Sequence, residues 1–145
     1  MEGANRESDE NPPCISIRVL CVDDNHDIAD STVTFLHLFG FEARACYDGR
    51  SALVEARTYM PNVFFIDLTM PGMDGDELVI HLRKETVEKP RLFVAVTAMS
   101  NDDAQERIQA AGFHLHLIKP VDPYKLVRVV DSWCRLGYVT SIVME

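Results

Sequence analysis

The chain has 145 residues, of which 47% are hydrophobic and 26% are charged, a composition typical of one globular domain with a buried core. Its formal net charge of −9 weighs against a general affinity for nucleic acid, because such binding depends on cations that neutralise phosphates. No apolar run approaches the roughly 20 residues of a membrane span, and the N-terminus has no apolar segment of the signal-peptide kind. We therefore expect a cytoplasmic protein with no membrane contact.

The two ends of the chain differ from its middle. Residues 1–14 are polar and acidic and contain Pro12-Pro13, which predicts a disordered tail. Residues 137–145 are unexpectedly apolar, and we expect them to pack onto the domain itself. The alternatives are a partner or dimer contact, or the first piece of a longer protein. Between them, residues 15–136 form one predicted domain.

The cysteines show no metal-ligand spacing and no CxxC motif, so we expect reduced thiols at all of them: Cys14, Cys21, Cys46 and Cys134. Two of these, Cys21 and Cys46, lie in strand-like apolar segments, where we expect them to fill the core.

Strand-like and helix-like segments alternate along the chain. The predicted strands are 15–22, 41–47, 63–66, 91–98 and 113–118. Each precedes a segment of helical periodicity, and these segments are 28–39, 52–59, 78–82 with an extension toward 87, 104–111 and 126–134. Gly40, Pro61 and Gly112 end three of the helices. Five such repeats predict an α/β fold with a five-stranded parallel sheet covered by helices on both faces.

Polar residues stand where the predicted strands end. Asp23 and Asp24 follow the first strand, Asp67 ends the third, Thr97 ends the fourth, and Lys119 follows the fifth. The carboxyl ends of parallel strands share one edge, where open α/β sheets bind ligands. With the strand order 2-1-3-4-5, the first and third strands are neighbours, and the three carboxylates converge.

Three close carboxylates repel one another, and a hard divalent cation bound between them would neutralise their charges. Mg²⁺ prefers such oxygen ligands, and Mn²⁺ would fit the same set. Lys119 and Thr97 would add a positive charge and a hydroxyl donor for the oxygens of a phosphoryl group. Asp67 could then act as a nucleophile that forms an aspartyl phosphate.

Four short motifs in this order resemble the receiver domain of two-component response regulators. They are "VLCVDDN", "FFIDLTMPGMDG", "VAVTA" and "IKP", and the resemblance extends from about residue 16 to about residue 135. It implies a flavodoxin-like (βα)5 three-layer sandwich with the strand order 2-1-3-4-5.

The resemblance also implies a role for each site residue. Asp67 would accept a phosphoryl group from a histidine kinase or a histidine phosphotransfer protein. Mg²⁺ would be bound by the side chains of Asp24 and Asp67, by Asp23 through water, and by the backbone carbonyl of Thr69. Lys119 and Thr97 would contact the phosphate.

Two departures from the receiver pattern lead to further expectations. In receivers, a ring three residues before the lysine swings inward when the threonine moves, and His116 occupies that position here. Histidine titrates near neutral pH, so we predict a pH-sensitive switch formed by Thr97 and His116. Thr69 and Met99 border the path of the hydrolytic water but carry no carboxylate or amide to orient it, which predicts a long-lived phosphate.

The leading interpretation is a stand-alone, phosphorylation-controlled binding module that is not an enzyme beyond its own phosphorylation and dephosphorylation. It would be a monomer or a phosphorylation-dependent dimer whose output partner the sequence does not identify. Asp74 is interpreted as a structural turn residue, and Asn25 as a helix cap.

Three alternatives remain open. "VDDNHDIADS" also looks like receivers that are segments of a hybrid histidine kinase or of a larger regulator. An aspartyl-phosphate phosphohydrolase would need a general-acid aspartate two residues after Asp67, where Thr69 stands. A flavodoxin-like cofactor carrier would need a phosphate-binding loop where Asp23 and Asp24 stand.

Overall fold

A computed structural model describes residues 17–136 of the chain as one parallel sheet with helices on both sides. The strands are β1 (Arg18–Val22), β2 (Glu42–Cys46), β3 (Val63–Asp67), β4 (Leu92–Thr97) and β5 (Leu115–Ile118), in the order β2-β1-β3-β4-β5. The predicted α/β class and strand order are therefore confirmed. The expected tail (1–14) and C-terminal extension (137–145) lie outside the described residues.

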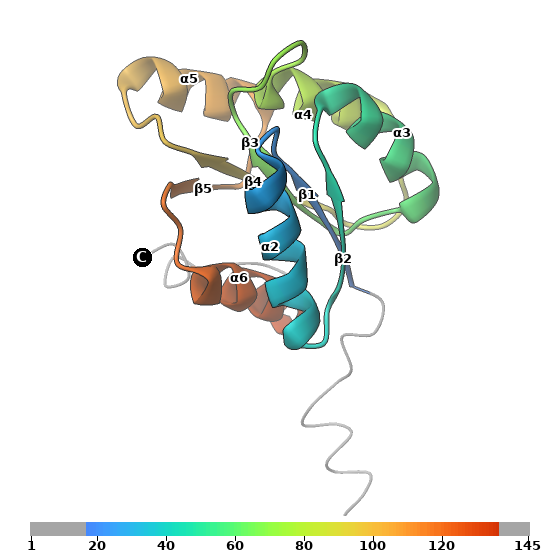
Figure 1. Cartoon of the computed structure of the whole chain (residues 1–145). Helices are drawn as coiled ribbons and strands as arrows, with labels where there is room; N and C mark the ends of the chain where they lie inside the picture. The colour runs from blue at the N-terminus through green and yellow to red at the C-terminus, as the bar shows by residue number, and fades with distance from the viewer. Residues whose placement is uncertain (1–16, 137–145) are drawn as a thin grey trace, which may run out of the picture.

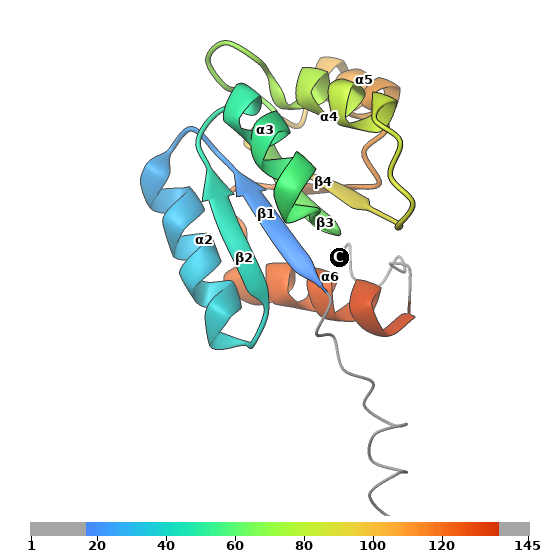
Figure 2. The same cartoon turned by 90° about the vertical axis from the view of Figure 1, so that its right-hand side faces the viewer.

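The helices form the two outer layers of the sandwich. They are α2 (His26–Leu38), α3 (Gly49–Tyr59), α4 (Gly75–Lys84), α5 (Asp102–Ala111) and α6 (Pro123–Leu136). Helices α2 and α6 cover one face, and α3, α4 and α5 lie on the other, as the two views in Figures 1 and 2 show. Among residues 17–136, no helix combines the length and apolar character that a membrane span requires.

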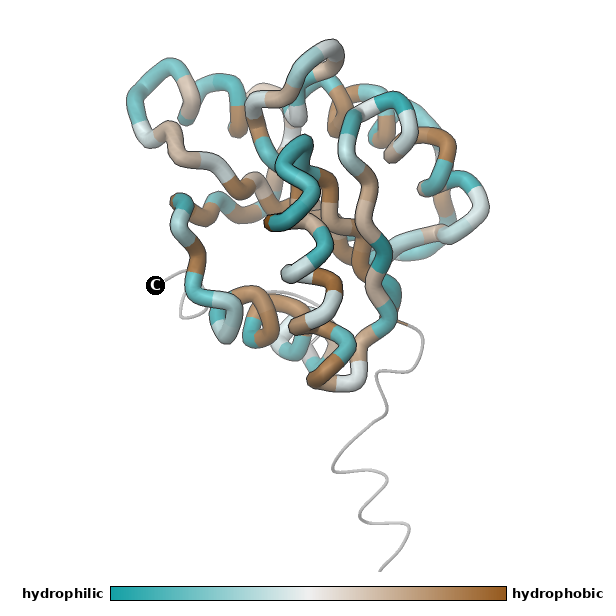
Figure 3. The backbone as a smooth tube through the Cα atoms, in the orientation of Figure 1, coloured by the Kyte–Doolittle hydropathy of each residue, from teal (hydrophilic) through white to brown (hydrophobic). Residues whose placement is uncertain are grey.

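The central strand β3 is buried along its whole length, because helices cover both of its faces. Its side chains alternate between two cores, with Val63 and Phe65 packed toward α2 and α6, and Phe64 and Ile66 packed toward α3 and α4. The hydropathy-coloured tube shows the apolar strands inside and a hydrophilic turn between β1 and α2 (Figure 3). That turn marks the edge of the sheet where the polar residues gather.

Several element boundaries differ by one to three residues from those expected. Among the described residues β1 begins at Arg18, and α4 ends at Lys84 rather than continuing toward 87. The fifth strand begins at Leu115 rather than at 113, because the side-chain Nδ1 of His114 accepts the hydrogen bond from the N–H of Phe93 at 3.0 Å. A side chain therefore replaces a backbone acceptor at the start of this strand pair.

The cysteines follow the expectation only in part. Cys21 and Cys46 are buried and free, which confirms their predicted place in the core. Cys134 is disulfide-bonded, so the expectation of reduced thiols is wrong for this residue.

Candidate phosphorylation and metal site

The paired ends of β1 and β3 bring three carboxylates together at the carboxyl edge of the sheet. Asp23, Asp24 and Asp67 each offer a side-chain oxygen, and these oxygens all lie within 4.8 Å of one another. The expected convergence of the three acids is therefore present. Asp23 and Asp67 are buried, whereas Asp24 is exposed.

The turn after β1 is held by its own hydrogen bonds. The Asp23 N–H donates to the Cys46 carbonyl at 3.1 Å, and the Asp23 carboxylate accepts the N–H of Asn25 at 2.9 Å. The side chain of Asn25 caps α2 by accepting the N–H of Ile28 at 3.1 Å. Because Asn25 is the cap, neither aspartate is used to begin the helix, and the predicted capping role of Asn25 is confirmed.

Lys119 reaches into this cluster from the end of β5. Its Nζ lies 2.9 Å from Asp23 Oδ2 and 3.4 Å from Asp67 Oδ2. The Lys119 N–H donates to the Thr97 carbonyl at 2.9 Å, and the Lys119–Pro120 peptide bond is cis. One ammonium group therefore faces two buried carboxylates.

The charges of the cluster remain unbalanced. Burial raises the pKa of Asp67 from 3.8 to about 6, and the nearby charge of Asp23 adds to the effect although Lys119 opposes it. Burial alone would lower the pKa of Lys119, but the hydrogen bond with Asp23 and the charge of Asp67 raise it above its ordinary value. With all groups ionised, three negative charges and one positive charge leave a net charge of −2.

Oxygen donors and a net charge of −2 match a hard divalent cation such as Mg²⁺, and Mn²⁺ fits the same donors. The three carboxylates stand close enough together to share one ion. The residues present therefore fit the metal that the sequence predicts.

Thr97 is the last residue of β4, and His116 lies in β5. Thr97 is 2% exposed, and its hydroxyl oxygen accepts the N–H of Met99 at 3.1 Å. His116 Nδ1 lies 3.0 Å from Nε2 of Gln105 on α5, while His116 Nε2 is buried with no hydrogen-bond partner among residues 17–136. Burial lowers the pKa of His116 below 6.5, with a smaller opposing effect from the Met99 backbone. Burial therefore shifts the expected titration of His116 further below neutral pH.

The loop between β3 and α4 depends on Gly75, the residue that follows Asp74. The Gly75 N–H donates to the Leu68 carbonyl at 2.8 Å. A Cβ at this position would lie 2.2 Å from the backbone oxygen of Asp67 and 2.8 Å from Ile66 Cγ2. Glycine therefore allows the start of α4 to contact the backbone of the proposed acceptor directly.

Arg107 on α5 is the functional candidate that the sequence reasoning missed. Its guanidinium contacts the carboxylates of Asp74 and Asp76 at the start of α4. The partners are separated by 33 and 31 residues, so no local pattern in the sequence links them.

Comparisons with known proteins agree with this geometry. Residues 19–131 match the family described as response regulator receiver domain. The transcriptional regulatory protein PrrA of Mycobacterium leprae is 34% identical over 126 residues, which are 87% of this chain and 53% of PrrA. The sensor histidine kinase GacS of Pseudomonas protegens is 31% identical over 137 residues, which are 92% of this chain and 15% of GacS. The chain thus spans about half of one relative and a small part of the other.

A solved structure of similar size supports the same assignment. The chemotaxis protein CheY4 of Vibrio cholerae superposes with a TM-score of 0.73 at 29% identity, covering 77% of this chain and 93% of that one. The fold is therefore the flavodoxin-like fold of CheY, and the family match is to receiver domains rather than to a phosphohydrolase or a flavin carrier. The chain belongs to the response regulator receiver domain family, and it is a receiver domain of the two-component signalling systems.

Proposed function

We propose that Asp67 accepts a phosphoryl group from a phosphohistidine of a histidine kinase or a histidine phosphotransfer protein, in a Mg²⁺-dependent reaction. The observation that carries the proposal is the buried Asp67 carboxylate, which shares a 4.8 Å cluster with Asp23 and Asp24 and lies 3.4 Å from Lys119. A carboxylate in such surroundings is a nucleophile beside groups that neutralise phosphoryl charge.

In the proposed step, a carboxylate oxygen of Asp67 attacks the phosphorus of the donor. The new P–O bond forms while the P–N bond to the donor histidine breaks, and the electron pair of that bond stays on the imidazole nitrogen. Lys119 then neutralises one phosphoryl oxygen, and the Thr97 hydroxyl donates a hydrogen bond to another. When bound at the three aspartates, Mg²⁺ supplies the positive charge that the carboxylates and the phosphoryl group require.

Phosphorylation would act on partner binding through the β4–β5 side of the site. Thr97 would turn its hydroxyl toward the phosphate, and His116 would follow into the space that Thr97 vacates. The result is a shift between two conformations that differ in their affinity for a partner. The domain would act in the cytoplasm and catalyse only its own phosphorylation and dephosphorylation. The similarity to GacS also favours a second context, in which this receiver serves as a segment of a hybrid histidine kinase.

Incubation with acetyl phosphate and Mg²⁺, followed by intact-mass spectrometry, tests the proposed acceptor. We expect wild-type protein to gain the mass of one phosphoryl group, and Asp67→Asn or an excess of EDTA to abolish the gain. Asp131→Asn is the matched control, because Asp131 lies on α6 and pairs with Arg135 at the surface. An unchanged mass in wild type, or a full gain in Asp67→Asn, would refute the proposal.

The proposed switch has its own test. His116→Tyr keeps a ring that can rotate but removes the titrating nitrogen atoms. We expect the affinity of the beryllofluoride-bound domain for its partner to vary with pH below about 6.5 in wild type only, because burial lowers the pKa of His116. Identical pH profiles for the two proteins would exclude His116 as a pH sensor.

A further inference from the structure

The peptide group between Thr69 and Met70 has a defined partner on its N–H side. The Met70 N–H donates to Oδ1 of Asp74 at 3.0 Å. The carbonyl of the same peptide group belongs to Thr69 and is the proposed backbone ligand of the metal. Because a peptide group is planar, a fixed N–H direction also fixes the direction of the carbonyl oxygen.

Asp74 is available for this contact because it does not cap its own helix. It occupies the position before α4 with extended backbone angles (φ −72°, ψ 164°), yet its side chain makes no capping hydrogen bond to α4. Its second carboxylate oxygen, Oδ2, instead lies 3.3 Å from Nη2 of Arg107. The carboxylate of Asp74 therefore bridges the loop peptide and helix α5.

Arg107 is itself held in place by a second carboxylate. Its Nε and Nη2 lie 3.0 Å from Oδ2 and Oδ1 of Asp76, a two-point contact between planar groups. The exposed fraction is 26% for the Arg107 side chain and 22% for that of Asp76, so the pair is partly shielded from solvent. Burial alone would raise the pKa of Asp76, but the hydrogen bonds and charge of Arg107 bring it below its ordinary value. The guanidinium thus has a fixed orientation from which Nη2 reaches Asp74.

We propose that Arg107 is a positioning residue for the metal centre, acting through Asp74 to orient the Thr69–Met70 peptide group so that the Thr69 carbonyl faces the cation. The proposal rests on the proposed function, because it concerns the same metal site. It assigns Asp74 and Arg107 a role in metal affinity rather than in turn formation alone, as partners behind the ligands do in metal sites generally.

The same contacts connect the metal site to α5. Arg107 belongs to α5 rather than to the loop that it restrains, so a displacement of α5 would release the Thr69–Met70 peptide group. A second contact, from Thr69 Oγ1 to Met99 Sδ at 3.3 Å, joins this loop to the segment that leads into α5. Because coupling of binding free energies is reciprocal, metal binding would in turn favour the described position of α5.

The test is a Mg²⁺ titration by calorimetry on the full chain after metal removal, with the melting temperature measured for each variant. We expect Asp74→Ala to weaken Mg²⁺ binding by about 10-fold, the lower end of the range for residues behind metal ligands. Arg107→Gln, which removes one partly exposed ion-pair partner, should weaken binding by about 3-fold. Asp74→Asn should keep more affinity than Asp74→Ala, because its amide oxygen can still accept the N–H of Met70.

Arg57→Gln is the control, because it also removes an ion pair that involves a helix, between Arg57 on α3 and Glu85 at 2.9 Å, and neither residue contacts Asp74 or Asp76. It should lower the melting temperature less than Arg107→Gln does, because the Arg57 side chain is 58% exposed and pairs with one carboxylate, and it should leave Mg²⁺ affinity unchanged. In the Asp74→Ala background, Arg107→Gln should have no further effect on affinity, since the connection is already broken.

Two results would overturn the inference. One is equal Mg²⁺ affinity in Arg107→Gln and Arg57→Gln. The other is a full 3-fold loss from Arg107→Gln in the Asp74→Ala background, which would show that Arg107 acts without Asp74. A wild-type protein that binds no Mg²⁺, or an Asp67→Asn variant that binds it equally well, would instead refute the proposed function.

Discussion

The charged side chains at the two ends of the sheet differ in how far their charges are balanced by neighbouring groups. At the carboxyl end, Lys119 faces both Asp23 and Asp67, and the set with Asp24 retains a net charge of −2. At the amino end, each arginine has a partner of its own. Arg18 donates to the Tyr59 carbonyl at 2.9 Å, and Arg91 donates to the Leu82 carbonyl at 3.1 Å.

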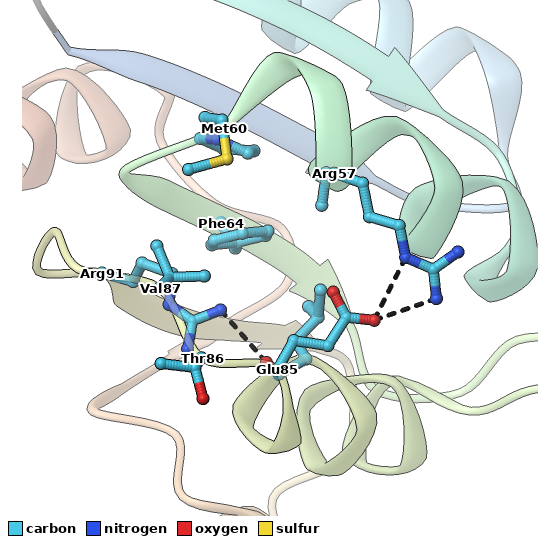
Figure 4. A pocket seen from close by; sticks show the side chains of 10 residues that line it. Arg57, Met60, Phe64, Glu85, Thr86, Val87 and Arg91 are labelled. Carbon is cyan, nitrogen blue, oxygen red and sulfur yellow. Dashed lines mark hydrogen bonds and ion pairs between the residues drawn. The ribbon is translucent and has the colours of Figure 1, made fainter.

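A small pocket at the amino end shows this local pairing directly (Figure 4). Arg57 pairs with Glu85 at 2.9 Å across the pocket rim, while Phe64 lies between Met60 and Val87 inside it. Its volume of about 160 Å³ is below the 300 Å³ or more of typical ligand pockets. These three arginines therefore bind carbonyls near the C-terminal ends of α3 and α4 or join the two helices.

The ion pair and hydrogen bonds at the amino end stabilise the fold, whereas the acidic cluster at the carboxyl end destabilises it. A buried acid with a raised pKa destabilises the folded protein near neutral pH. Such a cost is common where residues are arranged for binding or chemistry rather than for stability. Substitutions at the two ends should therefore differ in both the sign and the size of their effects.

The largest effect is expected for Gly75→Ala at the carboxyl end. The added Cβ would lie 2.2 Å from the backbone oxygen of Asp67, and backbone cannot move aside as a flexible side chain can. We expect the free energy of unfolding to fall by about 3 kcal/mol, the upper end for overpacking, as measured by urea denaturation. Mg²⁺ affinity should fall as well, because the shift displaces Asp67.

Gly40→Ala is the control for this prediction. Gly40 has a φ of +88° with open space where an alanine Cβ would stand, so only backbone strain of about 1 kcal/mol is expected. Equal losses of stability in the two variants would show that the close approach of α4 to the acceptor strand has no energetic importance.

The next effect has the opposite sign. In the metal-free protein, the folded state holds the Asp67 proton more tightly than the unfolded chain does, since the pKa is about 6 instead of 3.8. The free energy of unfolding therefore falls as the pH rises from about 4 to about 6. One pKa unit corresponds to 1.36 kcal/mol, so the full loss is about 3 kcal/mol. Asp67→Asn removes this penalty together with the contact to Lys119, so we expect a net stabilisation of about 2 kcal/mol at pH 7.5 in EDTA.

The stability that Asp67→Asn gains over wild type should shrink as the pH falls toward about 4. Mg²⁺ should stabilise wild type but not Asp67→Asn. Glu106→Gln on the exposed face of α5 removes a carboxylate without burial and serves as the control. If Asp67→Asn proves less stable than wild type at pH 7.5 without metal, the buried carboxylate of Asp67 does not destabilise the folded protein.

Much of this arrangement follows from local sequence patterns. Alternating strand and helix periodicities predict the sheet, and parallel geometry then predicts that Asp23, Asp24 and Asp67 converge. The pairing of Arg107 with Asp74 cannot be predicted in this way, because its two residues lie 33 positions apart on different helices. The expected start of β5 was wrong for a similar reason, since the acceptor for the Phe93 N–H is the His114 side chain. Contacts made by side chains across elements leave no periodic signal.

A smaller effect is expected for His114→Asn at the amino end of β5. Burial, with help from the charge of Arg83, lowers the pKa of His114, whose Nδ1 accepts the N–H of Phe93. The folded state thus resists protonation, so stability is present above pH 6.5 and is lost as the pH falls below it. Asparagine keeps an acceptor but does not titrate, and we expect under about 1 kcal/mol of change at pH 7.5. The difference in stability between pH 7.5 and pH 5.5 should narrow in the variant; an unchanged difference would assign the pH dependence to other groups.

The smallest effect concerns the lifetime of the phosphate rather than the fold. Thr69 and Met99 contact each other at 3.3 Å beside the site, and neither side chain has a carboxylate or an amide to orient an attacking water. We predict that phospho-Asp67 persists for minutes or longer in Mg²⁺ and that Thr69→Asn, which adds an amide, shortens the lifetime about 3-fold, equivalent to about 0.6 kcal/mol of barrier. Loss of the phosphoryl mass over time measures both rates. Thr69→Val, which removes the hydroxyl and adds no amide, should leave the lifetime unchanged. A wild-type half-life of seconds would mean that water is oriented by another group at the carboxyl end, and Asp24, the exposed acid of the cluster, would be the first residue to substitute.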